Sequence, residues 1–169
     1  MTHADLVTVA AKWLRTRKRC SVVVTELVSS TAEQPDALGY REQLPMLVEC
    51  KTSVADFRAD AKKMFRLRAD KGMGFYRWYM APADVALKIE SELPERWGLL
   101  SVDARGVRVV RDSGRFPASD HRAEIALLTS LVRRIGHSAP AGVSIKVYTH
   151  QTKCKAELHV SGEEENVDG

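Results

Sequence analysis

The sequence predicts an α/β fold in which a central mixed β-sheet is flanked by helices on both faces. Segments with helical apolar spacing alternate along the chain with short, β-branched apolar runs. The 169 residues correspond to one domain, since length predicts roughly one domain per 100 to 200 residues. The hydrophobic share of 44% and the charged share of 28% are typical of globular proteins, which excludes a disordered chain.

The first part of the chain predicts a helix followed by three strands. A helix from Asp5 to about Arg17 carries its apolar residues on one stripe. The β-branched run CSVVVTEL (20–27) predicts a buried strand. After the loop SSTAEQP, the segment DALGY (36–40) is a short strand or turn, and PMLVECK (45–51) is a second apolar strand.

The middle of the chain predicts a helix, a strand and a helix. Ser53 is a suitable N-cap for a helix from about Val54 to Asp70. The aromatic run GFYRWYMAP (74–82) predicts a strand. The segment ADVALKIESEL (83–93) has helical spacing and is stopped by a proline.

The last part predicts a hairpin, a helix and an extension. The segment WGLLSVDARGVRVVRD (97–112) predicts a hairpin with its turn at DARG, and a helix follows over about 119–135. The residues expected to face the core on this helix are Ile125, Leu128, Val132 and Ile135. We therefore divide the chain into an α/β domain (1–136) and a C-terminal β extension (137–169) that ends in the acidic GEEENVDG.

Charge and cysteine usage bound the partners and the compartment. The net charge is +4, which suits a polyanionic partner such as DNA, although each basic cluster also fits an ordinary solvated face. No apolar run approaches the ~18 residues of a membrane span, and no signal peptide is evident. Three scattered cysteines form neither a disulfide framework nor a zinc spacing. We expect a cytoplasmic protein without membrane contact.

Two charged residues at the end of an apolar strand indicate chemistry. Glu49 and Lys51 face one side of this strand, while Val48 and Cys50 face the other. Asp36 opens another short strand, so adjacent strands would bring its carboxylate next to that of Glu49. Neighbouring carboxylates repel, and a hard divalent cation such as Mg²⁺ or Mn²⁺ relieves that repulsion.

Two carboxylates, a metal and a lysine suit phosphodiester hydrolysis. The metal polarises a phosphate oxygen and activates water, while the ammonium of Lys51 orients that water or offsets charge in the transition state. The simpler explanation of Glu49 and Lys51 is an ion pair on an exposed strand.

The stretch PDALGY…LVECKTSVADFRADAKK resembles the PD-(D/E)XK nuclease superfamily. Pro35 and Asp36 occupy the PD positions, and Glu49, Cys50 and Lys51 occupy (D/E)XK. The core order of that superfamily, a helix, three strands, a helix and a strand, agrees with the predicted order over about half of the chain.

The resemblance implies a restriction endonuclease-like fold and a metal-dependent deoxyribonuclease. It implies that Asp36 and Glu49 bind Mg²⁺ or Mn²⁺, that the backbone carbonyl of Cys50 is a third ligand, and that Lys51 is the catalytic lysine. Many members also carry an acid on the first helix, and the candidate here is Asp5.

Two segments supply candidates for nucleic-acid contact. Lys62, Lys63 and Arg66 follow the motif on the predicted helix and would contact phosphates, unless they form an ordinary solvated face. Arg77 and Tyr79 lie in the aromatic strand and would contact unpaired bases, although half of that strand belongs to the core. The five histidines show no metal-ligand spacing.

Three functions remain open on the sequence alone. The first is a metal-dependent nuclease that cuts DNA, and the second is a non-cleaving DNA-binding or assembly module on the same fold. The third is an unrelated small enzyme or interaction protein with only a surface Glu-Lys pair. If residues 137–169 form an exposed sheet edge, two copies would pair there, so a homodimer is a further expectation. The alternative is that these residues cover the core of their own chain.

Overall fold

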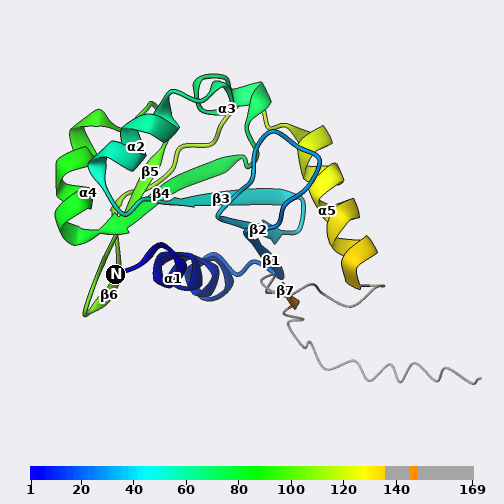
Figure 1. The fold of residues 1–169 in the computed structure, drawn as a ribbon, viewed down its shortest axis with the longest axis horizontal. Coiled ribbons are helices and arrows are strands. Elements are labelled where there is room, and N and C mark those ends of the chain that lie inside the picture. The colour runs from blue at the N-terminus through cyan, green and yellow to red at the C-terminus, as the bar shows by residue number, and fades with distance from the viewer. Residues whose placement is uncertain (136–144, 148–169) are drawn as a thin grey trace, which may run out of the picture.

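A mixed β-sheet lies between helices in the computed structural model, which describes residues 1–135 and 145–147 (Figure 1). The strands are β1 (Val22–Thr25), β2 (Ala37–Arg41), β3 (Leu44–Cys50), β4 (Tyr76–Pro82), β5 (Gly98–Asp103), β6 (Gly106–Arg111) and β7 (Ile145–Val147). The helices are α1 (His3–Thr16), α2 (Val54–Ala61), α3 (Met64–Leu67), α4 (Ala83–Ile89) and α5 (His121–Ile135), with 3₁₀ turns at Ala69–Lys71 and Glu90–Glu92. The predicted α/β class is confirmed.

The sheet has the strand order β6-β5-β4-β3-β2-β1-β7. Strands β1, β2 and β3 run antiparallel to one another, β4 and β5 run parallel to β3, and β6 returns antiparallel to β5. Helices α2 and α4 make the crossovers that parallel strands require. The carboxyl ends of β3, β4 and β5 therefore meet at one edge of the sheet, where α/β proteins generally bind ligands.

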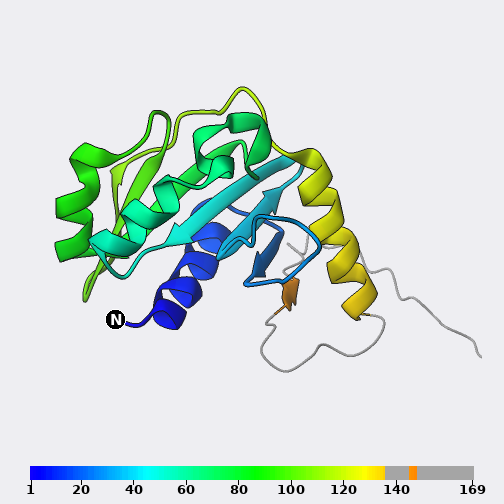
Figure 2. The same cartoon turned by 45° about the horizontal axis from the view of Figure 1, so that its top comes forward.

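Helices cover both faces of the sheet, as predicted. One core is built from α1, and the opposite core contains residues of α2, α4 and α5 (Figures 1 and 2). Adjacent residues of β4 belong to different cores, with Trp78 beside α1 and Tyr79 on the α2 side. This alternation is the two-residue period of a strand buried on both faces.

Helix α1 begins with a capping box. Thr2 Oγ1 accepts a hydrogen bond from the Asp5 amide at 3.2 Å, and Asp5 Oδ2 accepts one from the Thr2 amide at 2.8 Å. These bonds satisfy amides that have no partner within the helix. Asp5 is thus committed to capping, and we withdraw it as an active-site acid of the first helix.

The predicted hairpin is confirmed, whereas the helix predicted directly after the Glu49–Lys51 motif is divided in two. The hairpin over 97–112 is confirmed as β5 and β6, with its turn at residues 104–105. The helix expected over 54–70 is instead broken, because Lys63 adopts an extended conformation between α2 and α3. The break turns Arg66 of α3 inward, where it is only 5% exposed.

The predicted inner face of α5 is wrong for two residues. Ile125 and Val132 are 63% and 67% exposed, whereas Leu127 and Leu131 are buried. The face of α5 that carries the buried Glu124 points to the core. Leu127 and Leu131 are three and seven positions after Glu124, so they lie on the same face. The face with Ile125 and Val132 is therefore exposed, and the face that combines Glu124 with Leu127 and Leu131 packs against the core.

The end of the described chain adds one strand. Leu128 of α5 is partly buried against the core, and the side chain of Ile135 lies outside the described residues. Strand β7 pairs antiparallel with β1, which agrees with an edge strand in the C-terminal extension. The rest of 137–169, on which the homodimer expectation depends, lies outside the described residues.

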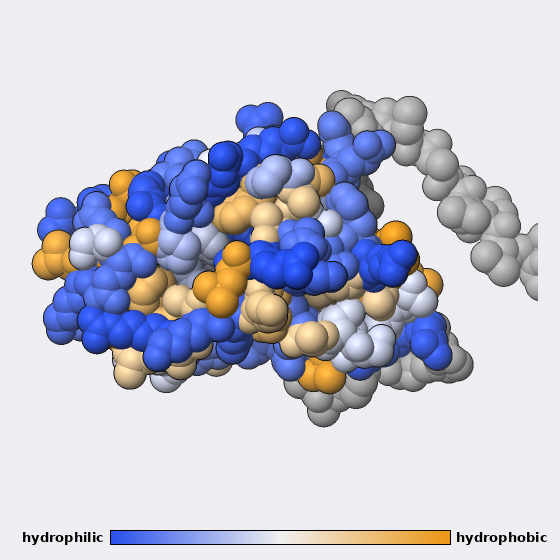
Figure 3. Space-filling view, turned by 90° about the horizontal axis from the view of Figure 1, so that it is seen from above, coloured by the Kyte–Doolittle hydropathy of each residue, from blue (hydrophilic) through white to orange (hydrophobic). Residues whose placement is uncertain are grey.

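The outer surface over α2 and α4 is mostly hydrophilic. Figure 3 shows this face from above, with hydrophobic residues scattered among hydrophilic ones. Exposed apolar residues on these helices and on α3 include Met64, Leu67 and Leu87. Within residues 1–135 and 145–147, no helix has the length and apolar character needed to cross a membrane.

Candidate active site

The motif residues lie at the end of β3. Val48 and Cys50 pack in the core beside α1, and Glu49 and Lys51 point to the opposite side, where they contact each other. The distance from Lys51 Nζ to Glu49 Oε2 is 3.4 Å, and both side chains are buried. The predicted pairing of their directions is confirmed, and neither residue lies on an exposed strand.

Asp36 and Glu49 are neighbours across β2 and β3. The antiparallel register pairs Ala37 with Val48, so the next residues outward, Asp36 and Glu49, lie opposite each other. Opposite residues of this kind have Cβ atoms about 4.5–5.5 Å apart. Asp36 Oδ2 also accepts a hydrogen bond from the Cys50 amide at 2.7 Å. The structure therefore brings the two predicted carboxylates together.

The Glu49 carboxylate has one occupied and one free oxygen. Oε2 lies 2.9 Å from Arg66 Nη2, in addition to its contact with Lys51. Oε1 is buried and has no hydrogen-bond partner. Burial raises the pKa of Glu49; the charge of Arg66 opposes this rise and that of Asp36 adds to it. A buried acceptor without a partner costs free energy, which a bound cation would relieve.

Arg66 connects three carboxylates. Its Nη2 contacts Glu49, its Nε donates to Asp60 Oδ2 at 2.7 Å, and its Nη1 donates to Glu33 Oε1. Glu33 Oε2 also accepts from the Met73 amide at 2.6 Å. The buried guanidinium binds three internal carboxylates and does not reach the surface, so we withdraw the prediction that Arg66 contacts nucleic acid.

Asp60 of α2 holds Lys51 from the other side. Its Oδ1 lies 3.5 Å from Lys51 Nζ and 2.9 Å from Lys63 Nζ, and its Oδ2 accepts from the Tyr79 hydroxyl at 3.1 Å. Burial acts to raise the pKa of Asp60, but the charges of Arg66 and Lys51 outweigh burial and lower it. Burial likewise acts to lower the pKa of Lys51, and Glu49 and Asp60 raise it on balance. Lys51 is therefore held charged between two carboxylates.

The two residues predicted from the aromatic strand are internal. The Tyr79 ring stacks on Trp97 with centroids 4.3 Å apart and is fully buried. Arg77 is also fully buried, and its guanidinium donates to backbone carbonyls of Ala69, Gly72 and Gly74. We withdraw both as contacts to nucleic-acid bases, because neither side chain reaches the surface.

The lysines that follow α2 are accessible. Lys62 is exposed, and the Lys63 side chain is 52% exposed while its ammonium contacts Asp60. Both lie next to the buried cluster rather than within it. Their contact with phosphates stays a prediction.

Three further residues belong to the site and were missed from the sequence. Glu33 and Asp60 bind Arg66 as described, and His3 Nε2 lies 3.4 Å from Asp36 Oδ1 and 3.5 Å from Glu26 Oε1. Asp60 follows the motif on the next helix, where a polar residue pointing back at the strand is a usable signal. Glu33 lies in a loop and His3 at the start of α1, and local sequence gives no signal for either.

The residues present fit a divalent cation in part. Asp36, Glu49 and the Cys50 carbonyl supply oxygen donors, and Glu49 Oε1 has no other partner. Four acidic side chains, Glu33, Asp36, Glu49 and Asp60, lie around the buried cations of Lys51 and Arg66, and the partly exposed Lys63 contacts Asp60. Acidic side chains therefore outnumber the Lys and Arg side chains of the cluster. In the part of the chain that the structure describes, no group of three or more His, Cys, Asp or Glu side chains is arranged to hold a metal. A cation here would keep several waters, as Mg²⁺ usually does.

The fold and site define an α/β protein with a buried charge cluster at the carboxyl ends of its parallel strands. No protein-family profile and no curated protein matches the chain. Among solved structures, the chain is similar to SPO1766, a protein of unknown function from Silicibacter pomeroyi. The identity is 24% and the TM-score 0.58, over 80% of this chain and 90% of that chain. This similarity shows the fold alone.

Proposed function

We propose that this chain is a metal-dependent nuclease that hydrolyses phosphodiester bonds of DNA in the cytoplasm. The observation that carries the proposal is the placement of Asp36 opposite Glu49, with Lys51 next along the same face of β3. The free Oε1 of Glu49 supports it, because a cation would satisfy this buried acceptor. The resemblance to PD-(D/E)XK nucleases rests on the same three residues.

Each residue then has a chemical role. Asp36, Glu49 and the Cys50 carbonyl would hold Mg²⁺ or Mn²⁺. Bound there, the ion would polarise a phosphate oxygen and lower the pKa of a water molecule. Lys51 is held charged by Glu49 and Asp60, so its ammonium offsets negative charge on the phosphate without reorganisation. Lys62 and Lys63 contribute contacts to the DNA backbone.

One observation favours the alternative of a non-cleaving DNA-binding or assembly module. Glu49 Oε2 is already paired with Arg66 and Lys51, so a cation has only Oε1 to bind without breaking an ion pair. A module that has lost its metal would be stabilised by such internal pairing. The experiment below therefore measures DNA binding and cleavage separately.

The test is cleavage of labelled single-stranded, double-stranded and branched DNA with Mg²⁺, Mn²⁺ or EDTA. The substitutions are Glu49→Gln and Lys51→Met, which keep side-chain size, and Glu95→Gln is the matched control because Glu95 is exposed. Metal-dependent cleavage that is lost in both site variants and kept in the control would support the nuclease. DNA binding without cleavage at any metal concentration would favour the non-cleaving module, and absence of both would reject the two functions together.

A further inference from the structure

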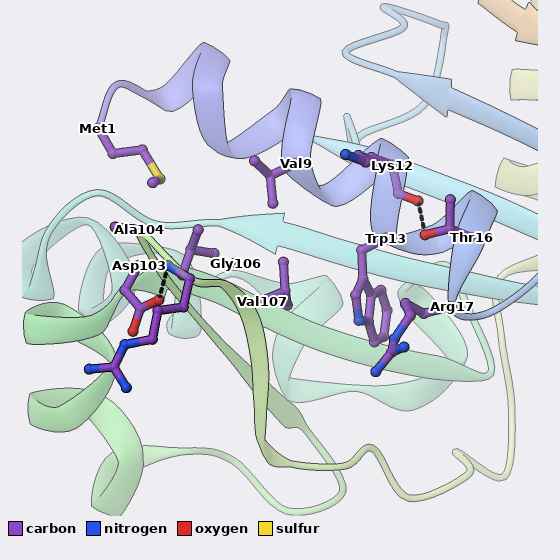
Figure 4. Close-up of a pocket in the computed structure, with 12 residues that line it drawn as sticks. Met1, Val9, Lys12, Trp13, Thr16, Arg17, Asp103, Ala104, Gly106 and Val107 are labelled. Atoms are coloured by element: carbon purple, nitrogen blue, oxygen red, sulfur yellow. Dashed lines mark hydrogen bonds between the residues drawn. The ribbon is translucent and has the colours of Figure 1, made fainter.

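A hollow of about 440 Å³ lies between α1 and the β5–β6 hairpin, on the face of the sheet opposite the buried charge cluster (Figure 4). Its floor is apolar, and Val9 and Val107 point toward each other across it, with Trp13 beside them. Its size is within the range of about 300–1,000 Å³ of ligand pockets. We call it the α1–β6 hollow.

The rim of the α1–β6 hollow is basic and unpaired. Lys12, Arg17 and Arg105 line it, and none of them forms an ion pair with a carboxylate within residues 1–135 and 145–147. The acid in the lining is Asp103, whose Oδ1 accepts a hydrogen bond from the Arg105 amide at 2.8 Å. Three free cations around one acid leave the rim with a net positive charge, which attracts a polyanion.

One end of the hollow lies at the sheet edge that also carries the candidate active site. Met1 lines the hollow, and His3, two residues later, contacts Asp36. Asp103 ends β5 at the same sheet edge at which Lys51 follows β3, because these strands are parallel and separated only by β4. Two strand spacings correspond to about 10 Å. Glu49 and Lys51 face the side opposite α1, so a ligand bound at Asp36 and Lys51 reaches the hollow by passing around this sheet edge.

We propose that the α1–β6 hollow binds a single-stranded segment of the nucleic acid whose phosphate is cleaved at Asp36 and Glu49. Phosphates would contact Lys12, Arg17 and Arg105, and the sugar or base would rest on the apolar floor. The strand is single because a base must be unpaired to enter a hollow between a helix and a hairpin. The inference rests on the proposed function, since it extends the substrate of that site.

The test measures binding of fluorescein-labelled oligothymidine in EDTA, where no cleavage occurs, over a series of salt concentrations. The hollow variant combines Lys12→Gln, Arg17→Gln and Arg105→Gln. The control variant removes the same charge elsewhere through Lys88→Gln, Arg122→Gln and Arg133→Gln, at exposed positions outside the hollow.

We expect the hollow variant to bind at least tenfold more weakly at moderate salt and to lose about 2 units of slope in log K against log [salt]. Each phosphate contact to a single strand contributes about 0.7 to that slope, and three contacts are removed. The control variant should keep the wild-type slope. On a blunt duplex of the same length, the loss of affinity in the hollow variant should be smaller than on the single strand.

The outcomes separate the hollow from the active site. If the hollow variant and the control bind oligothymidine equally, or if duplex binding falls as much as single-strand binding, the hollow proposal is overturned. Metal-dependent cleavage by the wild-type chain would still stand in that case. If the wild-type chain neither binds nor cleaves nucleic acid, the proposed function and the hollow proposal fail together.

Discussion

Arg66 Nη2 lies 2.9 Å from Glu49 Oε2, and both side chains are buried. The same guanidinium binds Glu33 in the loop before β2 and Asp60 in α2. One cation thus fixes the carboxylate that we assign to the metal and connects it to two other elements. Buried ion pairs of this kind contribute little net stability when complete, but breaking one is costly.

The first prediction is that Arg66→Met destabilises the protein strongly. The substitution leaves three buried carboxylates without their shared cation, and removal of one partner of a buried pair costs about 3–5 kcal/mol. Urea unfolding followed by circular dichroism measures the change. Arg58→Met is the control, because Arg58 pairs with Glu92 at the surface, and it should change the midpoint little. Equal midpoints for the two variants would contradict the role of Arg66.

The second prediction concerns the dependence of stability on pH. The pKa of Asp60 is lowered from its ordinary 3.8, so the folded chain keeps this carboxylate ionised where the unfolded chain has bound a proton. Its ion pairs therefore stabilise the fold fully above about pH 5, and this contribution is lost as the pH falls through the folded pKa. The difference in unfolding free energy between wild type and Asp60→Asn should shrink steadily on acidification. A difference that stays constant with pH would exclude this account.

The third prediction is that Arg77 cannot be replaced by lysine. Its guanidinium donates to three carbonyls of the segment 69–74, and an ammonium cannot reach them with the same geometry. We expect Arg77→Lys to cost about 2–4 kcal/mol and to speed amide hydrogen exchange in that segment. Arg96→Lys serves as the control, because the side chain of Arg96 makes exposed contacts, a hydrogen bond to the Arg115 carbonyl and an ion pair with Glu95. Unchanged exchange in the Arg77 variant would argue against a structural role.

The fourth prediction is that the buried thiols react slowly. Burial raises the pKa of Cys20 to about 11, with Arg41 and Lys18 opposing it, and burial also raises that of Cys50. In a Cys154→Ser variant at pH near 8, the folded protein should react with a thiol reagent far more slowly than the same protein in guanidinium, where both thiols are free. Fast reaction of the folded variant would show that one of these sites opens readily.

Most of the site features that could be predicted from the sequence follow from the alternation of side chains along a strand. The two-residue period placed Glu49 and Lys51 on one face, and the motif pointed to Asp36, which the antiparallel register then sets opposite Glu49. These relationships follow from local geometry, which one sequence contains. The helices on both faces followed from the same patterns.

Tertiary contacts decided the features that the sequence did not predict. Arg66 turns inward only because the helix breaks at Lys63, and its partner Glu33 comes from a loop without a periodic pattern. Ile125 was expected in the core because its stripe of α5 is apolar, but the burial of Glu124 rotates that stripe outward. In each case a buried charge outweighs the apolar pattern.

The ion pairs of Arg66 with Glu33 and Asp60 restrict which substitutions these three positions can accept during evolution. Replacement of Arg66 alone leaves buried carboxylates without compensation, and replacement of Glu33 or Asp60 alone removes one of the three partners of Arg66, whereas joint replacement by apolar residues removes these charges together. Relatives of this chain are therefore expected to keep or exchange positions 33, 60 and 66 as a set. Arg58 and Glu92 form an exposed pair, so each of them can be substituted independently of the other.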